Sequence, residues 1–290
     1  MSAAPLRLAT RGSRQALAQS NAVAAAVRAG CGRDVELVEI STYGDRTQRD
    51  DVPLHSIGGQ GVFVKEVQRA VLDGRADLAV HSAKDLPSEP ADGLVIGAFT
   101  KRRDANDVLV GSTLDGLEDG ATVASGSVRR RAQLHAVRPD LRFVELRGNI
   151  DNRLEKRPCG GAIVMALAAL QILELTDRVD QLLGVEVFVP AVGQGCVAVE
   201  CRADDVATLE ALVSVDHADT RRSVEAERAF LGELGSGCSL PVGGHVIGDQ
   251  LHTFLADPAA GSSVGDVVSL GADPLASARQ AARTAQERLG

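Results

Sequence analysis

Strand-like and helix-like patterns of hydrophobic and polar residues alternate along the first two thirds of the chain. Residues 6–10 have the pattern of a strand, and residues 13–30 carry apolar side chains at helical spacing, with Gly30 as the expected C-cap. The same patterns predict further strands at 35–40, 76–80, 95–99, 107–110, 121–124, 142–146, 162–165 and 197–201. Helices are predicted at 62–72, 130–137, 150–156 and 167–173. This alternation predicts an α/β fold with mainly parallel strands.

The pattern changes in the last part of the chain. A helix is predicted at 219–234, hairpin-like strands at 242–256 and 263–270, and a closing helix at 274–289. Strands that follow one another directly, flanked by helices, predict a small α+β part. The changes in pattern place domain boundaries near residues 100, 190 and 216.

Composition narrows the class of protein. Of the 290 residues, 44% are hydrophobic and 24% are charged, as in an ordinary globular protein. Aromatic residues make up only 2% and the net charge is −8, which argues against a nucleic-acid partner. The sequence shows neither a secretory signal nor an apolar run long enough to span a membrane. We therefore expect a cytoplasmic protein without membrane or nucleic-acid partners, and nothing in the sequence requires more than a monomer.

Cys238 lies in a short run in which glycines precede it and Pro241 follows it. Inside a helix each Gly costs about 1 kcal/mol and Pro about 3 kcal/mol, so this run is predicted to be a loop. The glycines let another molecule approach the sulfur closely, whereas the alternative is a buried structural cysteine at a tight turn. An odd number of cysteines predicts free thiols in a reducing compartment. The spacings of Cys and His match no zinc site, so no metal is expected.

Arginines gather between residues 122 and 157, where nine basic residues stand against four acidic ones. Along the whole chain, three clusters of arginine and serine follow predicted strands and open predicted helices. They are Arg11 with Ser13; Ser127 with Arg129 and Arg130; and Arg147 with Arg153. Ligands of α/β sheets bind beyond the carboxyl ends of the strands, where hydroxyls, N–H groups and guanidiniums bind anions. The three clusters together predict a cleft for a polyanion with carboxylates or phosphates, although one cluster alone is better explained by solvated surface arginines.

Asp85 follows a predicted buried strand and stands next to Lys84. A carboxylate at such a strand end can stabilise a cation or shuttle a proton. The alternative, from spacing alone, is an Asp that caps the turn before Pro87. The glycine-rich runs of the chain lack the remaining residues of a P-loop or a dinucleotide fingerprint, so no nucleotide cofactor is indicated.

Six motifs taken together resemble the porphobilinogen deaminase family, also called the hydroxymethylbilane synthases. They occur in the family's order over nearly the whole chain: Leu-Ala-Thr-Arg11-Gly-Ser13, His81-Ser-Ala-Lys84-Asp85-Leu-Pro87, Gly126-Ser127-Val-Arg129-Arg130, Leu-Arg147-Gly-Asn149-x-x-x-Arg153, Pro190-Ala-Val-Gly-Gln194-Gly195 and Gly237-Cys238-x-x-Pro241. The resemblance implies two α/β domains similar to periplasmic binding proteins, one formed by residues 1–100 and 196–215 and the other by 101–190. It also implies a small α+β domain over 216–290.

The resemblance further implies a reaction of tetrapyrrole and haem biosynthesis. Four porphobilinogen molecules are deaminated, joined head to tail and released with water as hydroxymethylbilane. Cys238 would hold a dipyrromethane cofactor through a thioether, and Asp85 would be the catalytic carboxylate that stabilises the cation left when ammonia departs. The carboxylates of cofactor and substrate would be bound by Arg11, Ser13, Lys84, Ser127, Arg129, Arg130, Arg147 and Arg153.

The chain departs from the family pattern at Ser56 and Gln60, where lysines are common, and at Gly126, where a hydroxyl is common. Two other functions also fit part of the sequence. One is a non-catalytic binding protein for a polycarboxylated small molecule, which would not need the thiol. The other is a transferase with Cys238 as nucleophile, which would need a nearby His, and the nearest candidate in sequence is His245.

Overall fold

The computed structural model describes residues 4–42, 64–235 and 241–290. Cys238, Ser56 and Gln60 lie outside the described residues. The contacts between residues divide the chain into two compact units, which are described separately. Within the described residues, unit 1 holds 4–42, 64–103 and 196–222, and unit 2 holds 104–195, 223–235 and 241–290.

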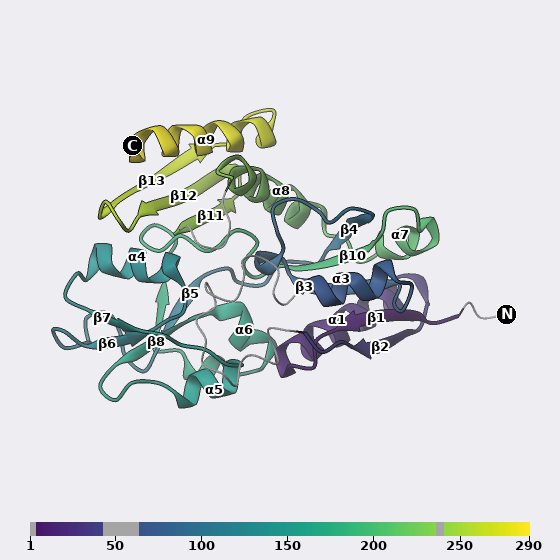
Figure 1. The fold of residues 1–290 in the computed structure, drawn as a ribbon, viewed down its shortest axis with the longest axis horizontal. Coiled ribbons are helices and arrows are strands. Elements are labelled where there is room, and N and C mark those ends of the chain that lie inside the picture. Colours follow the sequence, from purple (N-terminus) through teal and green to yellow (C-terminus); the bar gives the residue numbers. More distant parts are fainter. Residues whose placement is uncertain (1–3, 43–63, 236–240) are drawn as a thin grey trace. The chain divides into compact units, whose positions relative to one another are not determined.

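Unit 1 is built on a five-stranded sheet in the order β2-β1-β3-β10-β4 (Figure 1). Its strands are β1 (Leu6–Thr10), β2 (Val35–Glu39), β3 (Leu78–Ser82), β4 (Leu94–Phe99) and β10 (Val197–Arg202). The helices of this unit include α1 (Arg14–Cys31), α3 (Lys65–Leu72) and α7 (Val206–Leu212). Leu8, Leu78 and Val199 are fully buried in the core, as expected for strands of a sheet that helices cover.

Helix α1 begins and ends at residues whose local chemistry is clear. The Ser13 hydroxyl accepts a hydrogen bond from the Ala16 N–H at 3.3 Å, which satisfies one of the free donors of the first turn. Gly32 is the C-cap at φ 71°, a left-handed conformation that suits glycine. The prediction that Gly30 caps the helix is therefore wrong. Gly30 lies within the last turn, where a Cβ atom would collide with the Ser214 side chain.

Unit 2 contains a second five-stranded sheet, in the order β7-β6-β8-β5-β9. Its strands are β5 (Asp107–Val110), β6 (Thr122–Ala124), β7 (Arg142–Val144), β8 (Ala162–Ala166) and β9 (Gln181–Leu183). Helices α4 (Val128–Val137), α5 (Ile150–Glu155) and α6 (Leu167–Ile172) each follow one of the parallel strands β6, β7 and β8. Sheet order and strand directions repeat those of unit 1, because β5 runs antiparallel to its neighbours as β10 does.

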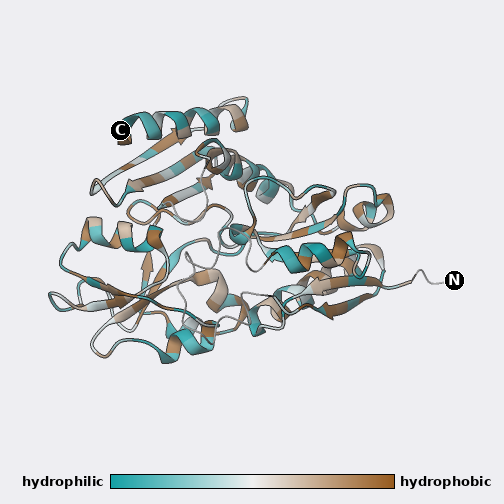
Figure 2. Ribbon diagram, in the orientation of Figure 1, coloured by the Kyte–Doolittle hydropathy of each residue, from teal (hydrophilic) through white to brown (hydrophobic). Residues whose placement is uncertain are grey.

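A separate antiparallel sheet in unit 2 has the order β11-β12-β13. Its strands are β11 (Val242–Ile247), β12 (Gln250–Asp257) and β13 (Ser262–Ser269), and the neighbouring helices are α8 (Ala218–Glu233) and α9 (Pro274–Leu289). Helix α9 lies along β12 and β13 and buries four alanines there: Ala278, Ala281, Ala282 and Ala285. The visible side of α9 is largely hydrophilic in Figure 2, as expected for a helix that covers one face of a sheet.

The predicted fold class is confirmed: two α/β sheets and a small antiparallel sheet with helices. The expectation of mainly parallel pairing is wrong, because parallel pairs join only three strands of each large sheet. β10 and β5 are each inserted antiparallel between two other strands, so parallel and antiparallel pairs are equally frequent. The division into three domains stays a prediction.

Candidate functional site

In unit 1, the predicted site residues lie at one edge of the sheet. β1 and β3 are parallel neighbours, so their carboxyl ends meet at the same edge. Arg11 and Ser13 directly follow β1. Lys84 and Asp85 follow β3 in a single 3-10 turn, Ala83–Asp85, where the Ala83 N–H donates to the Cys196 carbonyl at 2.9 Å. This backbone hydrogen bond ties the turn to the chain just before β10.

Asp85 is exposed at this edge, whereas the strand that leads to it is buried. His81 on β3 is only 5% exposed, and its Nε2 atom lies 3.1 Å from the Glu200 Oε2 atom on β10. The Gln68 side-chain amide of α3 donates to both Glu200 oxygens, at 2.9 and 3.2 Å. Because Glu200 is buried and held by these contacts, it fixes the position of β10 against the end of β3. The accessible Asp85 carboxylate is therefore carried on a rigid support.

In unit 2, the second and third arginine clusters also meet at one edge. β6 and β7 are parallel neighbours, and β6 pairs in parallel with β8, so the chain leaves all three strands on the same side. Ser127 follows β6 and N-caps α4, where its hydroxyl accepts a hydrogen bond from the Arg130 N–H at 3.4 Å. Arg147 follows β7. The structure thus places these segments at the carboxyl edge of the sheet, and their role in binding an anion stays a prediction.

Arg129 and Arg130 are buried, and both bind the carboxylate of Asp107. Arg129 Nη2 donates to Asp107 Oδ2 at 2.7 Å. Arg130 donates to Asp107 Oδ1 through Nη2 at 2.7 Å and through Nε at 3.0 Å. Burial lowers the pKa of the Arg129 guanidinium and the neighbouring Arg130 charge lowers it further, whereas Asp107 raises it. Both arginines were predicted from the sequence as candidates, whereas their shared acidic partner was not.

Arg147 is the unusual member of this edge. Its residue is 7% exposed, and none of its three guanidinium nitrogens has a hydrogen-bond partner among the described residues. A buried charge without a partner is costly, because burial removes its water without replacing it. Such a group is typical of a site that binds an anion.

Arg153 lies on α5, whereas Arg147 lies in the segment that precedes this helix. Its Nε atom donates to the Gly148 carbonyl at 2.8 Å, and Gly148 adopts φ 119°, which favours glycine. Asn149 caps α5 by accepting a hydrogen bond from the Asn152 N–H at 2.9 Å. The Leu146–Arg153 stretch therefore combines an N-cap with two arginines, as its sequence pattern predicted.

Gln194 and Glu227 are two further buried polar residues of unit 2 to which the sequence analysis gave no role. Gln194 is 1% exposed and donates from Nε2 to Asp107 Oδ1 at 2.9 Å and to the Ala105 carbonyl at 2.7 Å. The Glu227 carboxylate is fully buried and accepts hydrogen bonds from the N–H groups of Gly193, at 2.8 Å, and Val246, at 2.9 Å.

The sequence held only a weak signal for Asp107, which was a single acidic residue at the start of an apolar strand.

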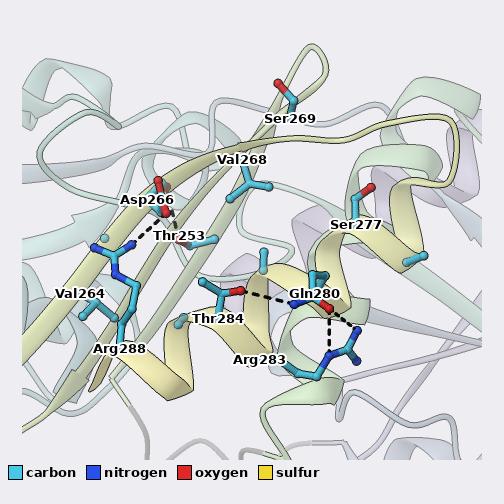
Figure 3. Close-up of a pocket in the computed structure, with 14 residues that line it drawn as sticks. Thr253, Val264, Asp266, Val268, Ser269, Ser277, Gln280, Arg283, Thr284 and Arg288 are labelled. Carbon is cyan, nitrogen blue, oxygen red and sulfur yellow. Dashed lines mark hydrogen bonds and ion pairs between the residues drawn. The ribbon is translucent and has the colours of Figure 1, made fainter. Parts of the chain in front are cut away.

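A cavity of ≈ 540 Å³ lies elsewhere in unit 2, between α9 and the strands β12 and β13 (Figure 3). Its polar side chains largely pair with one another: Arg288 binds Asp266 at 2.9 Å, and Arg283 binds Gln280 at 2.8 Å. None of the residues that the sequence predicted for the site lines this cavity. Because its charges already have partners, it offers an anion no counterpart to Arg147.

Several properties of the described residues bear on the remaining expectations. The four described cysteines are free, with Cys31 and Cys159 exposed and Cys196 and Cys201 buried. No helix in the described part of the chain is long and apolar enough to cross a membrane. Within the same residues, no three His, Cys, Asp or Glu side chains are grouped so that they would hold a metal ion.

Both α/β sheets carry arginines and N-capping serines at their carboxyl edges, and one of the arginines is buried without a hydrogen-bond partner among the described residues. These features are typical of an α/β protein that binds anions. The sequence model described as "Porphobilinogen deaminase, dipyromethane cofactor binding domain" matches residues 6–210. The chain belongs to the porphobilinogen deaminase family.

Related sequences and a solved structure complete the comparison. A porphobilinogen deaminase of Brevibacillus brevis is 44% identical over 280 residues, which cover 93% of this chain and 90% of that protein. A porphobilinogen deaminase of Thermobifida fusca is 46% identical over 251 residues, which cover 84% of this chain and 78% of that protein. The crystal structure of the methionine-binding protein MetQ aligns with a TM-score of 0.45 at 14% identity, covering 77% of this chain and 93% of that one.

Proposed function

We propose that this protein joins four porphobilinogen molecules head to tail with loss of ammonia and releases hydroxymethylbilane. The observation that carries the proposal is the buried Arg147 guanidinium, which has no hydrogen-bond partner among the described residues. Each porphobilinogen brings an acetate and a propionate, which are the anions that such a guanidinium binds best. The name of the relatives, a deaminase, favours an enzyme over a non-catalytic binding protein.

Arginines of both units would neutralise the growing chain, which gains two negative charges with each ring. We assign this role in unit 1 to Arg11, with Ser13 and Lys84 assisting, and in unit 2 to Ser127, Arg129, Arg130, Arg147 and Arg153. A hydrogen bond to a charged group contributes about 1.5–3 kcal/mol, so several of them hold a polyanion firmly. The N-cap positions of Ser13 and Ser127 support this role, because the first turns of α1 and α4 leave N–H donors free for an anion.

A dipyrromethane cofactor fits the same donor set, because it too carries carboxylates and the Arg147 guanidinium lacks an anion. We propose that Cys238 holds it through a thioether and that Arg129, Arg130, Arg147 and Arg153 bind its carboxylates. When bound, the cofactor supplies the pyrrole end to which the first substrate is joined. Cys238 is then an anchor for the chain, not a nucleophile that turns over.

Asp85 would be the catalytic carboxylate. It is exposed at the end of β3, on a strand that the buried pair of His81 and Glu200 supports. Loss of ammonia from porphobilinogen leaves a methylene-pyrrole cation, and a fixed negative charge beside it lowers the barrier. When the new C–C bond has formed, an Asp85 carboxylate oxygen accepts the proton that the pyrrole ring loses as it becomes aromatic again.

Intact-mass measurement combined with an assay for hydroxymethylbilane tests this proposal. In a host that makes porphobilinogen, the purified protein is expected to be heavier than its sequence by one dipyrromethane. Cys238→Ser should lose that mass and the activity, whereas Cys159→Ser, which changes an exposed cysteine, should keep both. An active protein with unmodified Cys238 would contradict the anchor role. A loaded but inactive wild-type protein would contradict the proposed reaction.

We also propose that the protein works as a monomer in the cytoplasm and is organised as three domains, residues 1–100 with 196–215, 101–190 and 216–290. The separate core of the small sheet, which includes Phe230, Leu251 and Leu255, supports the third of these domains. Size-exclusion chromatography with light scattering tests the oligomeric state, and limited proteolysis tests the domain boundaries.

A further inference from the structure

Asp107 is the only acid of a strand that is otherwise apolar. It is the first residue of β5, which runs antiparallel to β8 and pairs Asp107 with Ala166, the last residue of β8. This register places a carboxylate at the carboxyl edge of the sheet, where an antiparallel strand begins and the parallel strands end. Asp107 is fully buried. A buried acid at this edge therefore needs cationic partners, and the two arginines at the start of α4 supply them.

Each of these two arginines is held at two points. Arg129 binds Asp107 with Nη2 and the Val189 carbonyl with Nη1, the latter at 2.6 Å. Arg130 binds Asp107 with Nε and Nη2 and the Val164 carbonyl with Nη1, the latter at 3.1 Å. A planar guanidinium with two separate anchors has one orientation, so the remaining N–H groups point in fixed directions.

Gln194 fixes the carboxylate in turn. Its side-chain amide bridges Asp107 Oδ1 and the Ala105 carbonyl, so Asp107 cannot rotate without breaking hydrogen bonds on both sides. The neighbouring Gly193 N–H donates to the buried Glu227. The turn that carries Gln194 is thereby fastened to α8.

Among the described residues, Asp107 is the one carboxylate that pairs with these two guanidiniums, so it balances only one of their two positive charges. A purely structural ion pair needs one cation for each anion, and burying a second positive charge beside the first opposes folding. Such an arrangement is typical of a functional site, where the second charge serves a ligand.

We propose that Asp107 is a positioning residue. It orients the Arg129–Arg130 pair, and it leaves one of their two positive charges for a carboxylate of the pyrrole substrate or of the growing chain. This inference rests on the proposed function. It adds Asp107, with Gln194 as its support, to the residues on which substrate affinity depends.

Steady-state kinetics of Asp107→Asn test the inference. Asparagine keeps the shape but removes the charge and turns an NH₂ group toward a guanidinium. We expect KM for porphobilinogen to rise by about tenfold and kcat to change much less, because binding and not chemistry is weakened. Asp140→Asn is the matched control, since Asp140 pairs with Arg138 at 2.8 Å in the same unit. It should leave KM unchanged. All rates are normalised to the cofactor-loaded fraction measured by intact mass.

Two further variants keep the test decisive if Asp107→Asn does not fold. Gln194→Met has a similar length and removes only the amide that holds Asp107, so we expect a smaller rise in KM with the fold retained. In an Arg129→Lys background, Asp107→Asn should add less than its effect in the wild type, because it acts through the arginines. A loss of thermal stability with unchanged KM in folded variants would overturn the inference. An inactive wild-type protein would instead overturn the proposed function.

Discussion

Arg147 sets binding against stability at the level of a single residue. Its guanidinium is buried without a hydrogen-bond partner in the described part of the chain. Replacing even a buried ion pair with apolar side chains of similar size is often neutral or stabilising, by up to about 4 kcal/mol, and a buried charge without a partner is costlier than a pair. We therefore predict that Arg147→Met raises the melting temperature of the protein without cofactor. In protein made with porphobilinogen, the same substitution should lower the rate of product formation by at least about tenfold.

Differential scanning fluorimetry of protein made without porphobilinogen measures the first effect, and the product assay measures the second. Arg142→Met is the control, because Arg142 is exposed on β7, the strand that precedes Arg147 in the chain. It should change neither quantity. A marked loss of stability in Arg147→Met would mean that the guanidinium has a structural partner.

Asp85 gives the second prediction at this scale. Asp85→Asn removes a negative charge from an exposed side chain and leaves the shape of the turn, so the fold and the covalent cofactor should persist. Removing one preorganised electrostatic group from an active site costs about 10²–10³ in rate. We expect kcat to fall by about that factor. Circular dichroism and intact mass check the fold and the loading, and the exposed Asp92→Asn serves as control. Unchanged turnover would remove Asp85 from the mechanism.

Among the elements, the hairpin of β11 and β12 carries two histidines that make its stability depend on pH. His245 and His252 face each other across the two strands. The pKa of His252 lies below its ordinary value of 6.5, because burial disfavours the charged imidazole and His245 repels it, while Glu186 opposes the shift. The His252 imidazole of the unfolded chain therefore takes up a proton more readily than that of the folded chain. The contribution of His252 to the free energy of unfolding is fully present above about pH 6.5, and it is lost as the pH drops from there toward the lower pKa of the folded state.

We predict that His252→Gln reduces this loss of stability. Urea unfolding at about pH 7.5 and about pH 5.5 should show a larger drop for the wild type than for the variant. His135→Gln, which changes an exposed histidine on α4, should behave like the wild type. Equal drops in all three proteins would show that other groups cause the acid sensitivity.

How far the elements follow from the sequence depends on their length and periodicity. The bounds of β1, β5 and α9 agree with the predictions, because their apolar residues repeat at the spacing of a strand or a helix. β3 begins and ends two residues later than predicted. It includes two polar residues, the buried His81 and the half-buried Ser82, which the hydrophobic pattern did not assign to the strand. The three-residue strand β9 was not predicted, because so short an element has no detectable period.

The candidate site was predictable where residues follow strands. Arg147 and Ser127 were named as candidates because Arg and Ser at the start of a helix after a strand predict an anion site, and their role stays a prediction. Asp107 was not found, since one acid before an apolar run looks like the end of a turn. Only the register of β5 against β8 shows that it meets the arginines at the same edge. Antiparallel insertion of a strand depends on contacts distant in sequence, and local periodicity does not contain them.

At the scale of the whole molecule, the two large sheets share the same order of strand directions, with one antiparallel strand next to the edge strand. In unit 1 the inserted strand β10 comes from residues 197–202, after the chain has passed through residues 104–195 of unit 2. In unit 2 the inserted strand β5 is the first strand of the unit. In each unit, the antiparallel strand is thus the first strand that the chain forms after it crosses from the other unit. The return of the chain to the first sheet was implied by the family resemblance and not by the hydrophobic pattern.

Under the proposed function, the Arg147 guanidinium, which has no hydrogen-bond partner among the described residues, would also link the supply of ligand to the lifetime of the protein. An anion that binds the folded state and not the unfolded one shifts the folding equilibrium by mass action, by about 2.7 kcal/mol at a hundred times its dissociation constant. A newly made chain without the proposed dipyrromethane cofactor would thus be less stable than a chain that carries it, and proteases would cleave it more readily. Chains that have failed to acquire a primer would be removed first, so degradation itself would enrich the cell in working copies.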